Sequence, residues 1–338
     1  MHTKDISDVQ CINICALNVY GLHSKLTAGL FEKYILSYDI ICLSETKLTI
    51  NDKCDINGYK HLYHPSGGIH GISVLVTDTI CDDVSQIENT VSQCVLWLLF
   101  KNIDIIIGAV YIPPSSSDYY NDELFDDIMD DMSYLASQYK QPFVMLGDFN
   151  ARTANLDDDI DDIDFDLFNI DELYFDDCAM YNLPSGILHK RSNKDTVTNA
   201  NGLKLIEFCQ ITNLNIINGR VGGDSTKGDY TCHKYNGKSV IDYAIASKIL
   251  FQRVIDFYVD IYDTLLSDSH PPICLKLRYE SNLCMEMPNI SITRNTHTHI
   301  QVTIKSKWKR DCESIYTESF DADTMHHLHT KLLSFPEN

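Results

Sequence analysis

The sequence predicts an α/β protein in which two β-sheets pack face to face with helices outside them. Three observations support this fold class. Short runs rich in β-branched residues recur from Cys11 to about Arg278, some of them followed by a helical pattern, and each ends at a polar residue and a turn. Ten such runs are more than three predicted helices can cover in a single sheet, so we expect two sheets.

The predicted strands are short and strongly apolar, which is typical of strands buried on both faces. They cover residues 12–17, 40–43, 71–76, 95–100, 103–110, 143–146, 214–217, 240–246, 254–259 and 273–277.

Three stretches place apolar residues three and four positions apart and are predicted to be helices. They cover about residues 26–35, 124–135 and 202–212. In the second stretch the apolar side is clear, and its aspartates are predicted to face outward: Asp126, Asp127, Asp130 and Asp131.

The composition is that of a folded protein, with 44% hydrophobic residues in a chain of 338. The longest apolar stretches, residues 95–100 and 103–111, fall far short of the ~18 residues that a membrane-spanning helix needs. The first ten residues contain acids and no apolar segment, so they are not typical of a secretory signal. We therefore expect an intracellular protein with no membrane partner, nuclear if it acts on genomic DNA, whose twelve cysteines are free thiols.

The charge is strongly negative, at −21, and eleven of the acids lie between Asp157 and Asp177. Without them the rest of the chain still carries −10. Nucleic-acid binding would therefore depend on a local patch and a metal ion. We predict a domain over residues 11–279, interrupted by a solvated acidic loop at 156–177. It is preceded by a tail (1–10) and followed by a linker with a partly helical tail (280–338).

Five polar residues stand next to predicted strands, where a rigid backbone can hold a reactive group. Four of them follow a strand and the fifth precedes one: Asn18, Glu45, Tyr111, Asp148 and His270. If these strands share a sheet edge, we expect the five side chains to converge.

As a set, these residue types suit phosphodiester hydrolysis. Glu45 is a hard oxygen ligand for Mg²⁺, and Asp148 can orient or deprotonate water. The amide and phenol groups of Asn18, Asn150 and Tyr111 can position phosphate oxygens.

An acid inside the predicted strand 240–246 needs a partner, because its neighbours are apolar. His270 is the natural partner for this residue, Asp242. Capping of a neighbouring turn by Asp242 is an equally good account of this stretch taken alone.

Seven motifs in this order resemble the endonuclease/exonuclease/phosphatase superfamily and, more narrowly, the endonuclease domain of non-LTR (LINE-like) retrotransposons. They are LNVYGLHSKL, ICLSETKL, GGIHGISVLV, VYIPP, LGDFNAR, GKSVIDYAIAS and LSDSHPPI. The resemblance covers about residues 11–278. It implies a four-layer α/β sandwich of the deoxyribonuclease I type, with mainly antiparallel sheets and outer helices.

The resemblance also implies roles for individual residues. Glu45 would bind Mg²⁺, with Mn²⁺ as an alternative, and Thr231, Asp268 and Asn18 would contact the substrate. The implied catalytic residues are Asp148, Asn150, His270, Asp242 and Tyr111.

One departure concerns the end of the last motif, where the family usually has Ser-Asp-His. Here Ser269 stands between Asp268 and His270. On a regular strand an inserted residue turns the next side chain to the opposite face, unless a bulge or loop restores its direction.

The resemblance implies an enzyme that nicks one DNA strand and leaves a 3′-hydroxyl, which a reverse transcriptase of the same element extends. The partners would then be DNA and that reverse transcriptase. Two alternatives stay open: a relic that folds but no longer cuts, and a phosphatase of the same superfamily acting on a small or lipid phosphate.

Overall fold

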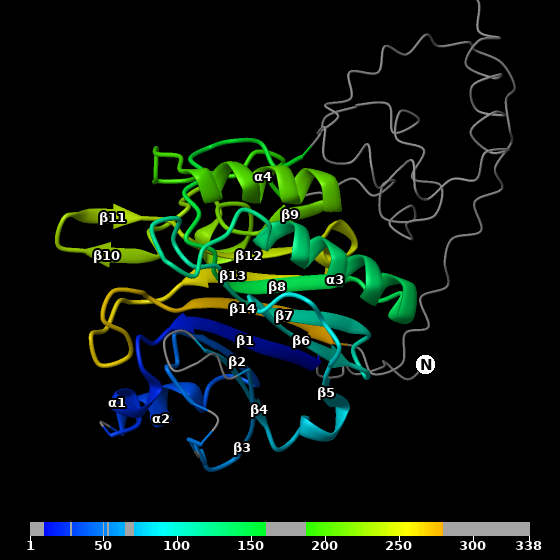
Figure 1. The fold of residues 1–338 in the computed structure, drawn as a ribbon, viewed down its shortest axis with the longest axis vertical. Helices are drawn as coiled ribbons and strands as arrows, with labels where there is room; N and C mark the ends of the chain where they lie inside the picture. Colours follow the sequence, from blue (N-terminus) through cyan, green and yellow to red (C-terminus); the bar gives the residue numbers. More distant parts are fainter. Residues whose placement is uncertain are drawn as a thin grey trace, which may run out of the picture. The chain divides into compact units, whose positions relative to one another are not determined.

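Two six-stranded sheets form the centre of the part of the chain that the structure describes (Figure 1). The computed structural model describes residues 10–279 except 28, 50, 53, 65–70 and 160–186. The predicted tails, 1–10 and 280–338, and most of the acidic loop therefore lie outside the described residues, apart from Gln10.

The first sheet has the strand order β13-β14-β1-β2-β4-β3. Its neighbours are antiparallel except for the parallel pair β1 and β2. The strands are β1 (Gln10–Asn18), β2 (Ile40–Ser44), β3 (Tyr59–His64), β4 (Ile72–Thr77), β13 (Val254–Val259) and β14 (Ile273–Tyr279).

The second sheet has the order β5-β6-β7-β8-β12-β9, and its parallel pair is β7 and β8. The strands are β5 (Val84–Gln86), β6 (Val95–Phe100), β7 (Ile105–Tyr111), β8 (Phe143–Asp148), β9 (Leu214–Ile216) and β12 (Asp242–Ser247). A separate hairpin of β10 (Cys232–Lys234) and β11 (Gly237–Ser239) projects beyond both sheets (Figure 1).

The helices lie outside the sheets and complete four layers (Figure 1). Helices α1 (Leu22–Leu26) and α2 (Leu30–Ile35) cover the first sheet, and α3 (Leu124–Tyr139) and α4 (Ala200–Thr212) cover the second. Three short 3-10 helices are η1 (Cys81–Asp83), η3 (Gly222–Asp224) and η4 (Lys248–Arg253).

The largest hydrophobic core lies between the two sheets, and alternation along the strands explains it. In β1, Ile14 and Ala16 point into this core, whereas Cys15 and Leu17 point outward to the side covered by α1 and α2. The predicted fold class, with its two sheets and outer helices, is thereby confirmed.

Several local predictions were wrong. The predicted helix at 26–35 is two short helices, because Gly29 adopts a left-handed conformation between them. Four strands were missed, β3, β5, β10 and β11; three of them have only three residues each, too few to show a period.

Asp131 is also an exception to the predicted outward face of α3. Its buried carboxylate accepts hydrogen bonds from the backbone amides of Val91 and Ser92 and from Trp97 Nε1, at 2.6, 3.1 and 3.1 Å. The acid thus anchors the loop before β6, a tertiary role that helical spacing does not reveal.

Asp158 corrects the prediction of a solvated loop at 156–177, because it is buried and bonded to Arg220. Within the described part of the chain, the nine cysteines are free thiols, as expected. None of the helices in that part is long and apolar enough to span a bilayer.

Candidate active site

The predicted site residues come from both sheets. Asn18 ends β1 and Glu45 follows β2 in the first sheet, whereas Tyr111 and Asp148 are register partners at the ends of β7 and β8 in the second. The convergence we expected at one sheet edge therefore occurs where the carboxyl ends of two parallel pairs meet across the sandwich.

One amide group joins two carboxylates at the centre of the site. Nδ2 of Asn18 donates to Oε1 of Glu45 at 2.8 Å and to Oδ2 of Asp148 at 2.9 Å. Oδ1 of Asp148 accepts the backbone amide of Asn150 at 2.8 Å, and the Asn150 side chain donates to the Ile112 carbonyl. Four of the predicted residues thus form a continuous hydrogen-bonded set.

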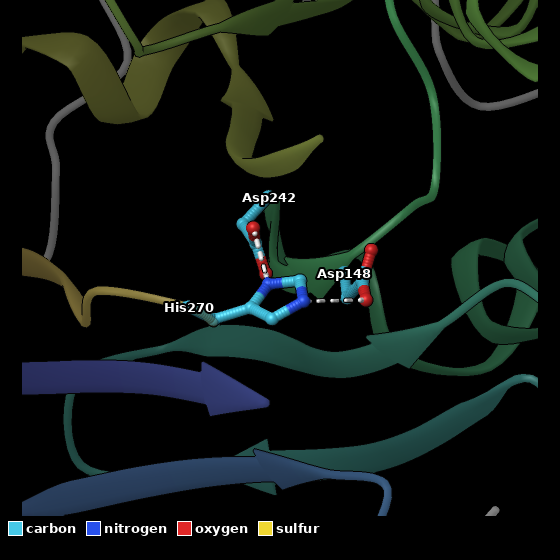
Figure 2. A group of neighbouring side chains, drawn as sticks. All are labelled: Asp148, Asp242 and His270. Atoms are coloured by element: carbon cyan, nitrogen blue, oxygen red, sulfur yellow. Dashed lines mark hydrogen bonds and ion pairs between the residues drawn. The ribbon is translucent and has the colours of Figure 1, made fainter. Parts of the chain in front are cut away.

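Asp242 and His270 form a buried pair beside Asp148 (Figure 2). Nδ1 of His270 lies 3.0 and 2.9 Å from the two carboxylate oxygens of Asp242, and Nε2 lies 4.0 Å from Oδ2 of Asp148. Burial alone would lower the pKa of His270, but the charge and hydrogen bonds of Asp242 outweigh it and raise that pKa well above its usual value. The ring is therefore held as an imidazolium with Nε2 turned toward Asp148.

The acid Asp148 is easier to protonate than an ordinary aspartate. Burial, together with the charge of Asp242 directly opposite it on β12, raises the pKa of Asp148 to about 7. Burial and the charges of Glu45 and Asp148 also raise the pKa of Tyr111, so its phenol stays protonated. A base that titrates near neutral pH is well matched to proton transfer.

The backbone at the site adopts conformations that side chains other than glycine rarely take. Glu45 and Asn150 have positive φ, at 50° and 46°. At Gly147, directly before Asp148, a Cβ atom would lie 2.0 Å from the Val110 carbonyl oxygen, so only glycine fits there. Such geometry persists where the surrounding structure fixes it, as it does at active sites.

Two buried side chains form hydrogen bonds with the backbone at Asp242. Oγ1 of Thr231 accepts the backbone amides of Ile241 and Asp242, both at 2.9 Å, and Nδ2 of Asn218 donates to the Asp242 carbonyl at 3.1 Å. Thr231 is fully buried, so its position suits a supporting role rather than the substrate contact that we predicted.

The loop before β14 accommodates the inserted Ser269. Oγ of Ser267 donates to the Asn18 carbonyl at 2.6 Å and accepts the His270 amide at 3.1 Å, which ties the loop to β1. The Ser269 carbonyl accepts the His233 amide of β10 at 2.7 Å. A loop rather than a regular strand therefore carries residues 267–270, and the side chain of His270 still faces Asp242.

Asp268 does not join the hydrogen-bonded cluster. Its carboxylate pairs with Lys25 of α1, with Nζ 2.5 Å from Oδ1. The structure thus brings together Asn18, Glu45, Tyr111, Asp148, Asn150, Asp242 and His270, but not Asp268.

The chemistry of the donor groups fits a hard divalent cation. Glu45 and Asp148 share a single amide donor, so they leave carboxylate oxygens and negative charge at one place. Asp148, Asp242 and His270 also offer ligand atoms within 4.8 Å of one another, but His270 Nδ1 is already bonded to Asp242. The oxygen ligands of Glu45 and Asp148 are therefore the better match for Mg²⁺ or Mn²⁺.

Three neighbours of the site were not predicted: Ser267, Asn218 and Cys232, whose Sγ lies 3.8 Å from Nε2 of His270. Ser267 belongs to the LSDSHPPI motif and could have been found there. Asn218 and Cys232 carry no signal in the sequence, because only the tertiary fold places them next to Asp242 and His270.

A family model described as the endonuclease/exonuclease/phosphatase family matches residues 15–263. The chain belongs to this family. Its members usually hydrolyse phosphodiester bonds and are generally dependent on divalent metals. The membership of this superfamily that the seven motifs indicated is thereby confirmed.

Three solved structures share the deoxyribonuclease I-like fold of this family member. An AP endonuclease, LMAP, from Leishmania major has a TM-score of 0.57 at 16% identity, covering 80% of this chain and 89% of its own. The 3′-5′ exonuclease NExo from Neisseria meningitidis gives 0.54 at 16%, covering 79% and 100%. The endonuclease domain of TRAS1, a telomere-specific non-LTR retrotransposon, gives 0.51 at 15%, covering 80% and 99%. No curated protein sequence matches the chain.

Proposed function

We propose that this protein is a divalent-metal-dependent DNA endonuclease of the retrotransposon type, which nicks one strand and leaves a 3′-hydroxyl. The observation that carries the proposal is the Asp148 carboxylate held between Asn18 and the Asp242–His270 pair. This arrangement provides a base, an oriented imidazolium and an amide donor around one point.

The residues divide the chemistry of hydrolysis among them. Asp148 takes a proton from the attacking water. With no metal bound, burial and the charge of Asp242 raise the pKa of this carboxyl to about 7. His270, oriented by Asp242, donates from Nε2 to a phosphate oxygen as negative charge develops. Water attacks phosphorus as its proton passes to Asp148, the bond from phosphorus to the 3′-oxygen breaks, and that oxygen takes a proton from solvent to leave as a hydroxyl.

Glu45 and Asp148 are the residues that would hold the divalent ion. When bound, the ion supplies a positive charge that stabilises the phosphate oxygens. Tyr111, kept protonated by its surroundings, would donate to the same phosphate group.

The retrotransposon assignment depends on the order of the seven motifs and is in keeping with the fold shared with the TRAS1 domain. DNA as the substrate is in keeping with the Neisseria enzyme NExo, which has been solved with a product DNA hairpin. The natural partner would then be a reverse transcriptase that extends the 3′-hydroxyl, acting in the nucleus on genomic DNA.

The test is incubation of the full chain with supercoiled plasmid and Mg²⁺. We expect conversion to the nicked form, ends that a DNA polymerase extends without further treatment, and loss of nicking on removal of the metal by a chelator. Asp148→Ala should lower the rate by about 10²–10⁴ because the base is lost.

The matched control is Asp159→Ala, which removes an aspartate bonded to Lys248 rather than to the site. It should nick like the unchanged protein. If the protein is folded but shows no metal-dependent nicking, the proposal is overturned and a relic that no longer cuts is favoured. If it hydrolyses inositol phosphates without nicking DNA, a phosphatase is favoured.

A further inference from the structure

Lys25 is a buried lysine whose ion-pair partner, Asp268, stands two residues before His270. Its side chain is only 8% exposed, whereas that of its ion-pair partner, Asp268, is 54% exposed. Among the described residues, Asp268 is the one carboxylate that pairs with it. A buried ammonium without an anion is costly, so this position always requires a negatively charged partner.

Lys25 lies between two segments of the chain, one carrying Glu45 and the other carrying His270. On one side, the start of α1 is bonded to the segment that carries the metal-binding candidate: the Gly21 amide donates to the Glu45 carbonyl at 2.8 Å. On the other side, Asp268 belongs to the loop that Ser267 ties to Asn18 and His270. The ion pair of Lys25 and Asp268 therefore links the segment that carries Glu45 to the loop that carries His270.

The Asp268 carboxylate is the replaceable member of the pair. Its backbone carbonyl is held by the Tyr262 hydroxyl at 2.6 Å, so the side chain can turn while the loop stays in place. The Asp268 side chain is 54% exposed, so solvent reaches it while it is paired with Lys25. A phosphate oxygen is an anionic acceptor of the same kind and would satisfy Lys25 equally well.

We propose that Lys25 is a phosphate-binding residue for a DNA backbone phosphate next to the scissile one, and that Asp268 holds its place in the free enzyme. As a role in DNA binding, this inference rests on the proposed nuclease function. The incoming phosphate displaces the Asp268 carboxylate into solvent, and the ion pair is exchanged without leaving Lys25 unpaired.

The first experiment tests the subsite without catalysis, with inorganic phosphate as the probe and no divalent metal. Asp268→Asn should lower the Tm, because Lys25 loses its anion, and added phosphate should restore it. The double variant Lys25→Met with Asp268→Asn should show less than half of that response. An equal response in the two variants, or none in Asp268→Asn, would overturn the proposal whether or not the protein cuts DNA.

The second experiment measures plasmid nicking by the full chain at several salt concentrations. Lys25→Met should raise KM about tenfold with little change in kcat and reduce the slope of log KM against log salt by about one, as expected for one lost phosphate contact. Asp268→Asn should lower KM about threefold, because the competing anion is gone.

The matched control for the kinetics is Asp159→Asn, which removes the same charge from a Lys pair beyond the opposite end of β12 from Asp242. Its KM should stay unchanged. If the unchanged protein nicks but Lys25→Met keeps its KM and salt slope, the phosphate subsite is wrong while the nuclease function stands. If nothing nicks, the nuclease function fails, and the thermal experiment still decides the subsite.

Discussion

Two of the buried aspartates that pair with a cation, Asp158 and Asp242, differ in their surroundings in one respect. Asp158 binds Arg220 through two hydrogen bonds, Nη1 to Oδ2 at 2.7 Å and Nη2 to Oδ1 at 2.6 Å. Asp242 binds His270 at a similar distance, but through one nitrogen of a ring whose other nitrogen faces the site.

The Arg220 pair is closed, in the sense that each guanidinium nitrogen donates to an acceptor within the protein. Its remaining guanidinium donors reach the carbonyl oxygens of Leu188, His189 and Ile216, and the Ile216 amide completes Asp158. The His270 pair is open, because Nε2 lies 4.0 Å from Asp148 and 3.8 Å from Cys232 Sγ, both beyond a strong hydrogen bond. A closed pair supports the fold, whereas an open pair can act on a substrate.

The largest expected effect is on activity at the open pair. His270→Gln keeps a donor for Asp242 but removes the imidazolium, so nicking should fall by about 10²–10⁴ while the Tm changes little. Single-turnover nicking and thermal unfolding check this. Unfolding in parallel with the loss of activity would mean that the His270 pair is structural, like the Arg220 pair.

The next effect is on stability at the closed pair. Asp158→Asn leaves the Arg220 guanidinium buried without its counter-charge, and we expect a loss of about 3–5 kcal/mol in the free energy of unfolding. Urea titration measures it, and Asp159→Asn, at a partly buried ion pair with Lys248, is the control. The nicking rate of the protein that stays folded should not change. A lower nicking rate in folded Asp158→Asn would mean that the Arg220 pair also takes part in activity.

A third effect is the pH dependence of stability, which has opposite signs at Asp158 and Asp148. Burial alone would raise the pKa of Asp158, but Arg220 outweighs it and lowers that pKa. Its contribution is therefore complete above the unfolded pKa of about 3.9 and is lost as pH falls through the lower folded value.

Asp148, with its pKa raised to about 7, binds its proton more tightly in the folded state. Without a divalent metal, it should make the protein less stable as pH rises from about 4 to 7. The measurement is the free energy of unfolding as a function of pH. In Asp148→Asn, the decrease between about pH 4 and 7 should disappear. In Asp158→Asn, part of the steep decrease below about pH 4 should disappear. A profile of Asp148→Asn that matches the unchanged protein would refute the raised pKa.

The pattern of local residues was enough to predict the fold class and which residues the fold would bring together at the candidate site. Strand periods and the polar residues beside them indicated Asn18, Glu45, Tyr111, Asp148 and His270, because strand ends are set by nearby residues. The three-residue strands β5, β10 and β11 were missed because a period needs more residues than they contain; the six-residue strand β3 and the break at Gly29 were missed as well.

The sequence by itself determined which chemical groups stand at the ends of which strands, and their order identified the family. The tertiary structure alone decided that Asp158 is a buried ion pair rather than part of a solvated loop, that His270 still faces Asp242 despite Ser269, and that Asp268 turns to Lys25. The physical reason is that burial and the aim of a loop side chain depend on partners far away in the chain. Arg220 lies 62 residues from Asp158 and Lys25 lies 243 residues from Asp268, distances over which no local pattern carries information.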